Sequence, residues 1–173
     1  MNVASDQATT DGPLDALYRR PGFLLRRAHQ ISAALFLEET AGLRLTTTQY
    51  GAMVVLRARG SLDQVGIATL VGIDRSTTAL VVSKLEEAGY IERRDDAVDK
   101  RRKIITLSPA GHEVLDQASA PAERARQRVL NAFSAKEAAQ FLGLLEQFVE
   151  AFNEQTRAPI KAEPSEKRAR RTV

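Results

Sequence analysis

The side chains best suited to chemistry lie on one side of a short stretch that begins at Asp74. Four residues at helical spacing predict the buried side of a helix there: Thr78, Val81, Val82 and Leu85. The outward side then carries Arg75, Ser76, Thr77, Ala79, Leu80, Ser83 and Lys84. All of these except Leu80 are small, polar or basic, and such residues can come close to base edges and phosphates. This face is therefore suited to contact with duplex DNA.

Leu80 is the exception on this outward face, and two interpretations of it stay open. An exposed leucine can contact the methyl group of a thymine. It can equally pack beneath a neighbouring hairpin.

A charged segment follows the helix, from Arg93 to Lys103. It contains six basic residues against three acidic ones, Asp95, Asp96 and Asp99. Arg94, Arg101, Arg102 and Lys103 are its candidate DNA contacts. Either Arg101 or Arg102 can enter a minor groove narrowed by A·T pairs, and Asp99 can hold that arginine in place. The alternative is a charged hairpin that is merely solvated.

These residues need elements that position them. Two short helices, 61–72 and 74–89, are expected to meet at Gly72, which accepts the left-handed backbone of a tight turn. Strands are predicted at 90–94 and 102–107, with Ile91, Ile105 and Leu107 sharing an inward face. Helix starts are indicated by the capping pairs Thr46 and Gln49, Ser61 and Gln64, and Ser134 and Glu137, by Asp74, and by Ser108 before Pro109.

Longer amphipathic helices flank this middle region. They are predicted at about 14–40, 47–59, 111–133 and 136–156, with a kink or break near Ala120 because Pro121 lies inside the third. The apolar stripes of the first and last helices are wide and suggest a homodimer.

The expected fold class is mainly α with a small β-wing, a winged helix-turn-helix plus a helical dimerisation lobe. The expected divisions are a flexible start at 1–13, a dimerisation helix at 14–45, the DNA-binding unit at 46–108, two dimerisation helices at 109–157 and a disordered basic tail at 158–173.

Composition excludes several classes of function. The net charge of +3 resides in residues 158–173, so the rest of the chain is neutral and only local clusters of charge can bind nucleic acid. The absence of cysteine excludes disulfides and thiolate metal sites. The two histidines, His29 and His112, are far apart in the chain and belong to no catalytic motif, so we expect neither an enzyme nor a metal or cofactor. No apolar run is long enough to span a membrane, and a cytoplasmic protein is expected.

The chain resembles the MarR family of bacterial winged-helix regulators over residues 14–156. The resemblance is carried by the segment 46–50, by the helix pair with 84–93, and above all by 99–111, Asp-Lys-Arg-Arg-Lys-Ile-Ile-Thr-Leu-Ser-Pro-Ala-Gly. It implies a homodimer in which each winged helix reads half of a palindrome in double-stranded DNA. Arg101 matches the wing arginine of the family, and 75–84 matches its recognition helix. Leu80 and Pro121 depart from the family pattern.

The resemblance also implies a small effector, an aromatic acid or its coenzyme A thioester, that binds between the lobes and releases the DNA. The segment 22–31 is similar to regulators of aromatic-acid catabolism. Arg26, Arg27 and His29 are candidate cations for the effector, with Phe36, Tyr50 and Met53 as its apolar wall. Neighbouring residues on a helix diverge by about 100°, so not all three cations can face one pocket. The alternative is a solvated arginine and an interior or dimer-contact histidine.

The function predicted from these features is a ligand-responsive transcriptional regulator, and a repressor in particular. The alternative is a winged helix that docks proteins and does not bind DNA by sequence. Steep loss of duplex affinity with rising salt would distinguish the first from the second.

Overall fold

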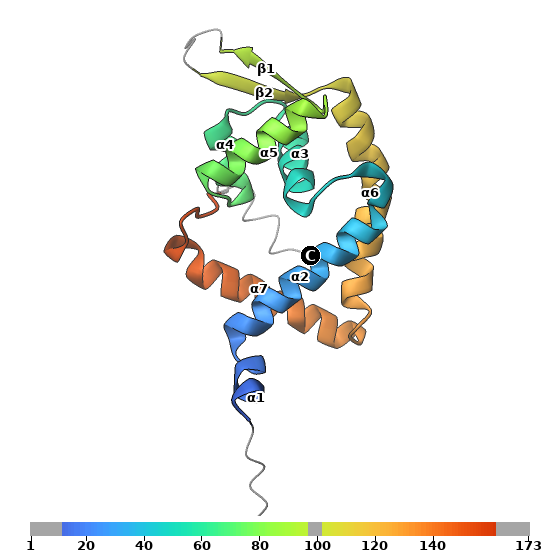
Figure 1. Cartoon of the computed structure of the whole chain (residues 1–173), viewed down its shortest axis with the longest axis vertical. Helices are drawn as coiled ribbons and strands as arrows, with labels where there is room; N and C mark the ends of the chain where they lie inside the picture. Colours follow the sequence, from blue (N-terminus) through green and yellow to red (C-terminus); the bar gives the residue numbers. More distant parts are fainter. Residues whose placement is uncertain (1–11, 97–101, 162–173) are drawn as a thin grey trace, which may run out of the picture.

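The computed structural model describes residues 12–96 and 102–161. Along these residues the chain forms seven α-helices, two strands and two short 3₁₀ turns (Figure 1). Their bounds are α1 Pro13–Tyr18, α2 Pro21–Glu39, η1 Ala41–Leu43, α3 Thr47–Arg59, α4 Gln64–Val71, α5 Arg75–Glu87, β1 Ile91–Asp95, β2 Lys103–Leu107, α6 Pro109–Leu130, α7 Ala135–Phe152 and η2 Asn153–Gln155.

The middle of the chain folds as three helices, α3, α4 and α5, beside a two-stranded sheet. β1 and β2 pair antiparallel with Ile91 opposite Leu107, and Leu62 adds a bridge to Ile105 in front of α4. The core beneath the sheet includes Met53, Leu56, Ile67, Val82, Leu85 and Leu115. Ile91, Ile105 and Leu107 are buried, as the spacing predicted. The arrangement is a winged helix-turn-helix, and the expected fold class is confirmed.

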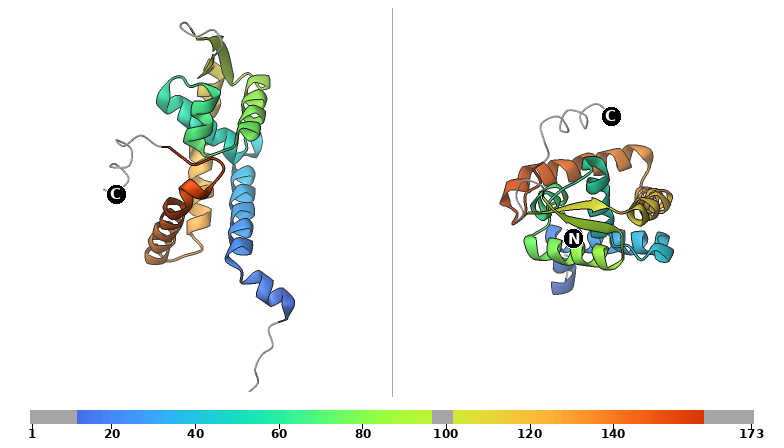
Figure 2. Two further views of the ribbon diagram at one scale, coloured as in Figure 1. Left: turned by 90° about the vertical axis from the view of Figure 1, so that its left-hand side faces the viewer. Right: turned by 90° about the horizontal axis from the view of Figure 1, so that it is seen from above.

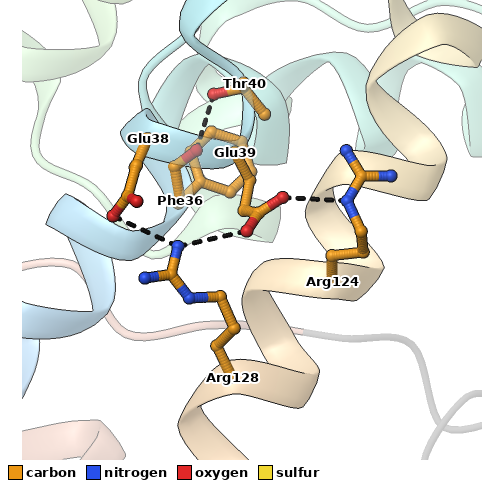
Figure 3. A network of polar contacts seen from close by, with 6 residues as sticks. All are labelled: Phe36, Glu38, Glu39, Thr40, Arg124 and Arg128. Carbon is orange, nitrogen blue, oxygen red and sulfur yellow. Dashed lines mark hydrogen bonds and ion pairs between the residues drawn. The ribbon is translucent and has the colours of Figure 1, made fainter.

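α6 leaves the sheet and packs along α2, so that the two helices form the stem of a second, helical lobe (Figures 1 and 2). Glu39 at the end of α2 accepts hydrogen bonds from Arg124 at 2.8 Å and from Arg128 at 3.1 Å (Figure 3). These bonds, that of Arg124 first, hold the pKa of Glu39 below its ordinary value against the opposing effect of desolvation. The carboxylate thereby ties α2 to α6 beside Phe36.

The first helix was expected to be continuous from about 14 to 40, and this was wrong. The structure has two helices, α1 and α2, separated at Arg19 and Arg20. Arg20 is extended, with ψ of 132°, and Pro21 occupies the first helical position of α2. A residue before proline is pushed out of the helical region, which explains the break.

Two further details of the helices differ from expectation. α4 begins at Gln64 with Asp63 as its cap, whose side chain accepts from Gly66 N–H, instead of at Ser61. Leu62 is held in its bridge to Ile105, so the helix cannot start earlier. Of the kink or break expected near Ala120, the break is absent: α6 runs through Pro121 as one helix, because its packing along α2 and α3 offsets the single backbone bond that proline removes. The kink stays a prediction. The caps at Thr46, Asp74, Ser108 and Ser134 are confirmed.

The helical lobe exposes a large apolar surface. On α1 and α2 this surface includes Leu14, Leu17, Leu24, Leu25 and Ile31, and on α7 it includes Leu144, Phe148, Val149 and Phe152. Within the described residues, no single helix is long and apolar enough to cross a membrane, while α4 and α5 together pass by length and composition with a bend of 111° between them.

Candidate nucleic-acid interface and neighbouring cavity

The start of α5 is organised around Asp74. Its carboxylate caps the helix by accepting from Thr77 N–H at 2.9 Å, and it also accepts from the hydroxyls of Ser76 and Thr77. These bonds, beginning with that of Ser76, hold the pKa of Asp74 far below its ordinary value. Both hydroxyls donate their proton to Asp74, so toward any other group they can act only as acceptors.

The outward face of α5 is divided into two halves. In the first half Arg75, Ser76, Ala79 and Leu80 are exposed, and Leu80 is 60% exposed. In the second half Lys84 pairs with Glu87 at 2.7 Å, and Ser83 donates to the same carboxylate. Lys84 is exposed as well, but its charge is already paired with Glu87, so the N-terminal half is the more accessible of the two for contact with phosphates and bases. Because Leu80 is this exposed, it does not pack beneath the wing, the hairpin formed by β1 and β2. Packing there was one of the two interpretations of Leu80.

α4 adds residues to this surface that the sequence analysis did not place there. Gln64, Val65 and Ala68 line a small hollow of about 170 Å³ together with Arg75 of α5. Val65 is 59% exposed. The 111° bend at Gly72, whose φ is +74°, sets α5 across α4 and brings these side chains together. The sequence analysis, which expected this helix to begin at Ser61, did not predict that Val65 would be exposed.

The wing is anchored by an ion pair that the sequence did not predict. Arg102 donates from Nε and Nη2 to one oxygen of Asp63, the residue that caps α4, at 3.2 and 2.6 Å. Burial opposes ionisation of Asp63, but the bonds from Gly66 N–H and Arg102 outweigh it and lower the pKa of this carboxyl. Asp63 is 39 residues away from Arg102 in sequence, and so local spacing could not pair them.

The other described basic residues of the wing also have acidic partners. Arg94 pairs with Glu92, Lys103 with Asp95, and Arg93 with Glu86 at the end of α5. Arg101 and Asp99, the expected groove-entering pair, lie outside the described residues.

A cavity of about 320 Å³ lies between the two lobes. Its wall is mostly apolar and comes from α2, α3, α6 and α7: Ser32, Phe36, Thr47, Tyr50, Ala122, Ala125, Arg126, Val129, Leu130, Phe141, Leu142 and Leu145. The rings of Phe36 and Tyr50 lie 5.4 Å apart, centre to centre. Phe36 and Tyr50 are thus brought together as the sequence predicted.

The other predicted ligand residues lie elsewhere. Arg26 and Arg27 both bond Gln30 on the exposed side of α2, and Arg26 also lies over the ring of Phe23 at 4.9 Å. His29 is exposed as well, and Met53 is fully buried in the core. None of these four described residues lines the cavity.

Among the described lining residues, the cation of the cavity wall is Arg126, which the sequence analysis did not identify. Its guanidinium bonds both oxygens of Glu123 at 2.8 and 2.6 Å and lowers the pKa of that carboxyl to about 2. Only the folded position of α6 against α2 and α3, which brings Arg126 to the cavity, distinguishes it from the other arginines of its helix.

Comparison with known proteins decides the family. Residues 45–103 match the model of the MarR family. The PcaV transcriptional regulator of Streptomyces coelicolor is 32% identical, with 76% of this chain covering 96% of PcaV at a TM-score of 0.68. The chain belongs to the MarR family.

Two further relatives are also transcriptional regulators. The HTH-type transcriptional repressor NicR of Pseudomonas putida is 25% identical over 130 residues, 75% of this chain and 82% of NicR. BpsR of Bordetella bronchiseptica, whose DNA binding is regulated by 6-hydroxynicotinic acid, is 26% identical over 76% of this chain and 94% of BpsR, with a TM-score of 0.70. This MarR-family chain is a transcriptional regulator with a winged-helix DNA-binding fold, and MarR-family proteins are regulators and not enzymes.

Proposed function

We propose that this regulator is a repressor that binds palindromic duplex DNA as a homodimer and is released by a small aromatic acid. The observation that carries the DNA-binding part is the exposed N-terminal half of α5. Arg75, Ser76, Ala79 and Leu80 stand out from the molecule on a rigid, capped helix, with Val65 of α4 beside them. Small side chains let the helix approach the groove floor, and the hydroxyl and guanidinium groups can bond bases and phosphates.

The homodimer is supported by the apolar surface of the helical lobe. Phe148, Val149 and Phe152 of α7 and Leu14, Leu24 and Ile31 of α1 and α2 are each 45 to 62% exposed. Burial of such residues in a two-fold interface removes apolar area from water at about 25 cal/mol per Å². The two copies of α5 then face successive major grooves, roughly 10 base pairs apart.

The effector is assigned to the cavity between the lobes. Its volume of about 320 Å³ suits a single aromatic ring, which Phe36, Tyr50 and Phe141 can cover. Arg126 can exchange Glu123 for the carboxylate of the ligand, since a guanidinium binds either bidentately. A coenzyme A thioester would leave most of its bulk outside a space of this size, so the free acid is favoured.

Release follows from the position of the cavity. Its walls belong both to α3 of the winged helix and to α2, α6 and α7 of the helical lobe. A ligand that binds best when these walls are further apart shifts the population of dimers toward a spacing that no longer matches the DNA. BpsR, regulated by an aromatic acid, is a structural relative that supports this assignment.

The experiment is a selection of duplexes from a random pool by the full-length protein, followed by affinity measurements at several salt concentrations. We expect an enriched palindrome whose affinity falls steeply as salt rises, because bound phosphates release counterions. Absence of any enriched sequence, or affinity that does not depend on salt, would contradict the proposed function.

A further inference from the structure

The chain that follows α7 turns back and settles against the turn between α4 and α5. Asn153, the first residue of η2, holds this segment with its side-chain amide. Its Nδ2 donates to the carbonyl of Ile160 at 3.1 Å, and its Oδ1 accepts from Ile160 N–H at 2.9 Å. Figures 1 and 2 show the segment, coloured red, rising from α7 to α4. Residues 158–161 therefore have a defined place in the fold, where a disordered tail was expected.

The contact with the helix-turn-helix is made by side chain and backbone together. A β-carbon built on Gly72 would lie 2.6 Å from Cγ1 of Ile160, so the isoleucine side chain sits directly on this glycine. Lys161 N–H donates to the carbonyl of Thr69 in α4 at 3.3 Å. Gly72 thus serves two purposes, the left-handed turn with φ of +74° and the close approach of Ile160.

The same segment is continuous with the cavity wall. Phe141, Leu142 and Leu145 of α7 line the cavity, and α7 ends at Phe152, directly before Asn153. A shift of α7 caused by a change in the cavity therefore reaches Asn153 through a rigid helix, and Ile160 through the two amide hydrogen bonds. From Ile160 it passes to Gly72, which lies just before the capped start of α5.

We propose that residues 153–161 form a strap that couples the position of α7 to the position of α5. While the strap is seated, displacement of α7 moves the turn at Gly72 and with it the outward face of α5. The regulatory role of the strap rests on the proposed function, because α7 is the wall that an effector would press upon. The mechanical coupling itself does not depend on DNA or on a ligand.

The coupling can be measured in the free, full-length protein by a double-mutant cycle with hydrogen exchange as the readout. Leu145→Ala perturbs α7 from the cavity side, and Ile160→Asp releases the strap. Ile160 is 41% exposed, so its replacement leaves the core intact. Leu142→Ala, at a position 41% exposed, takes the place of Leu145→Ala if that variant does not fold. Gln155→Ala, an exposed change in the same turn, is the control for the strap.

The amides to follow are those of residues 72–77. We expect Leu145→Ala to change their exchange rates several-fold in the wild-type and Gln155→Ala backgrounds, and by less than about 1.5-fold in the Ile160→Asp background. Asn153→Ala should behave like Ile160→Asp, because it removes both hydrogen bonds that hold the strap. An equal effect of Leu145→Ala with and without the strap, or no effect in either, would overturn the coupling. Failure of DNA binding in the selection experiment would leave this result untouched.

Discussion

Arg102 of the wing donates two hydrogen bonds to Asp63, and the same carboxylate caps α4. One side chain therefore fixes both the start of the first helix of the helix-turn-helix and the base of the wing. The two roles can be separated by substitution, because the cap needs only a short acceptor while the wing needs a charge.

Asp63→Ser should keep most of the stability but weaken DNA binding. Serine still accepts from Gly66 N–H, whereas Arg102 loses its ion pair with Asp63, so the wing is held less firmly beside α4 although the bridge between Leu62 and Ile105 remains. We expect about a tenfold loss of affinity for the selected duplex, equivalent to about 1.4 kcal/mol. Asp63→Ala should lose about 1 kcal/mol of unfolding free energy in addition. Anisotropy titrations and thermal unfolding report the two effects, and unchanged DNA affinity in Asp63→Ser would show that the anchor has no part in binding.

Leu80 should read a thymine methyl group. It is 60% exposed at the accessible half of α5, so Leu80→Ala should leave the melting temperature unchanged. In the selected duplex, replacement of one particular thymine by deoxyuridine should weaken wild-type binding by roughly 1 kcal/mol, because the methyl contact is lost. The same replacement should have no effect on Leu80→Ala. If every thymine can be replaced without loss for the wild type, Leu80 does not contact a methyl group.

Arg126 should anchor the carboxylate of the effector. Arg126→Gln should weaken binding of an aromatic acid by at least about tenfold, while DNA affinity without ligand stays the same. The probe is a calorimetric panel of substituted benzoates and 6-hydroxynicotinic acid. Arg124→Gln is a matched control on the same helix, since Arg124 bonds Glu39 and is outside the cavity lining. Equal losses in the two variants, or a panel without a single binder, would remove the anchor role.

Phe148 should lie in the dimer interface. It is 45% exposed on α7, and Phe148→Asp would place a charge in an apolar contact. Sedimentation should show a dimer for the wild type and a monomer for this variant. Leu80→Asp introduces the same charge at an exposed leucine of α5 and should remain dimeric. A wild-type protein that sediments as a monomer would contradict the homodimer.

The sequence predicted the features that depend on local spacing. The buried side of α5, its cap at Asp74, the turn at Gly72 and the shared face of Ile91 and Ile105 follow from periodicity and backbone preference, and the structure confirms them. Three features depend instead on residues that are far apart in the chain. They are the ion pair of Asp63 with Arg102, the position of Arg126 in the cavity wall, and the contact of Ile160 with Gly72. No local pattern carries such contacts. The prediction of one continuous helix over 14–40 was wrong because it followed the wide apolar stripe alone. Arg20 precedes Pro21, and a residue before proline is disfavoured in a helix, so the helix breaks there.

If the exposed N-terminal half of α5 reads DNA, a charge placed in the middle of this face must prevent binding. Ala79→Glu adds a negative charge at an exposed position in the middle of this face, so the fold should be kept while phosphates and base edges are repelled. Anisotropy titration of the selected duplex should show at least about a hundredfold loss of affinity for Ala79→Glu and none for Gln155→Glu, which places the same charge on η2. Wild-type affinity in Ala79→Glu would show that this face of α5 does not bind DNA.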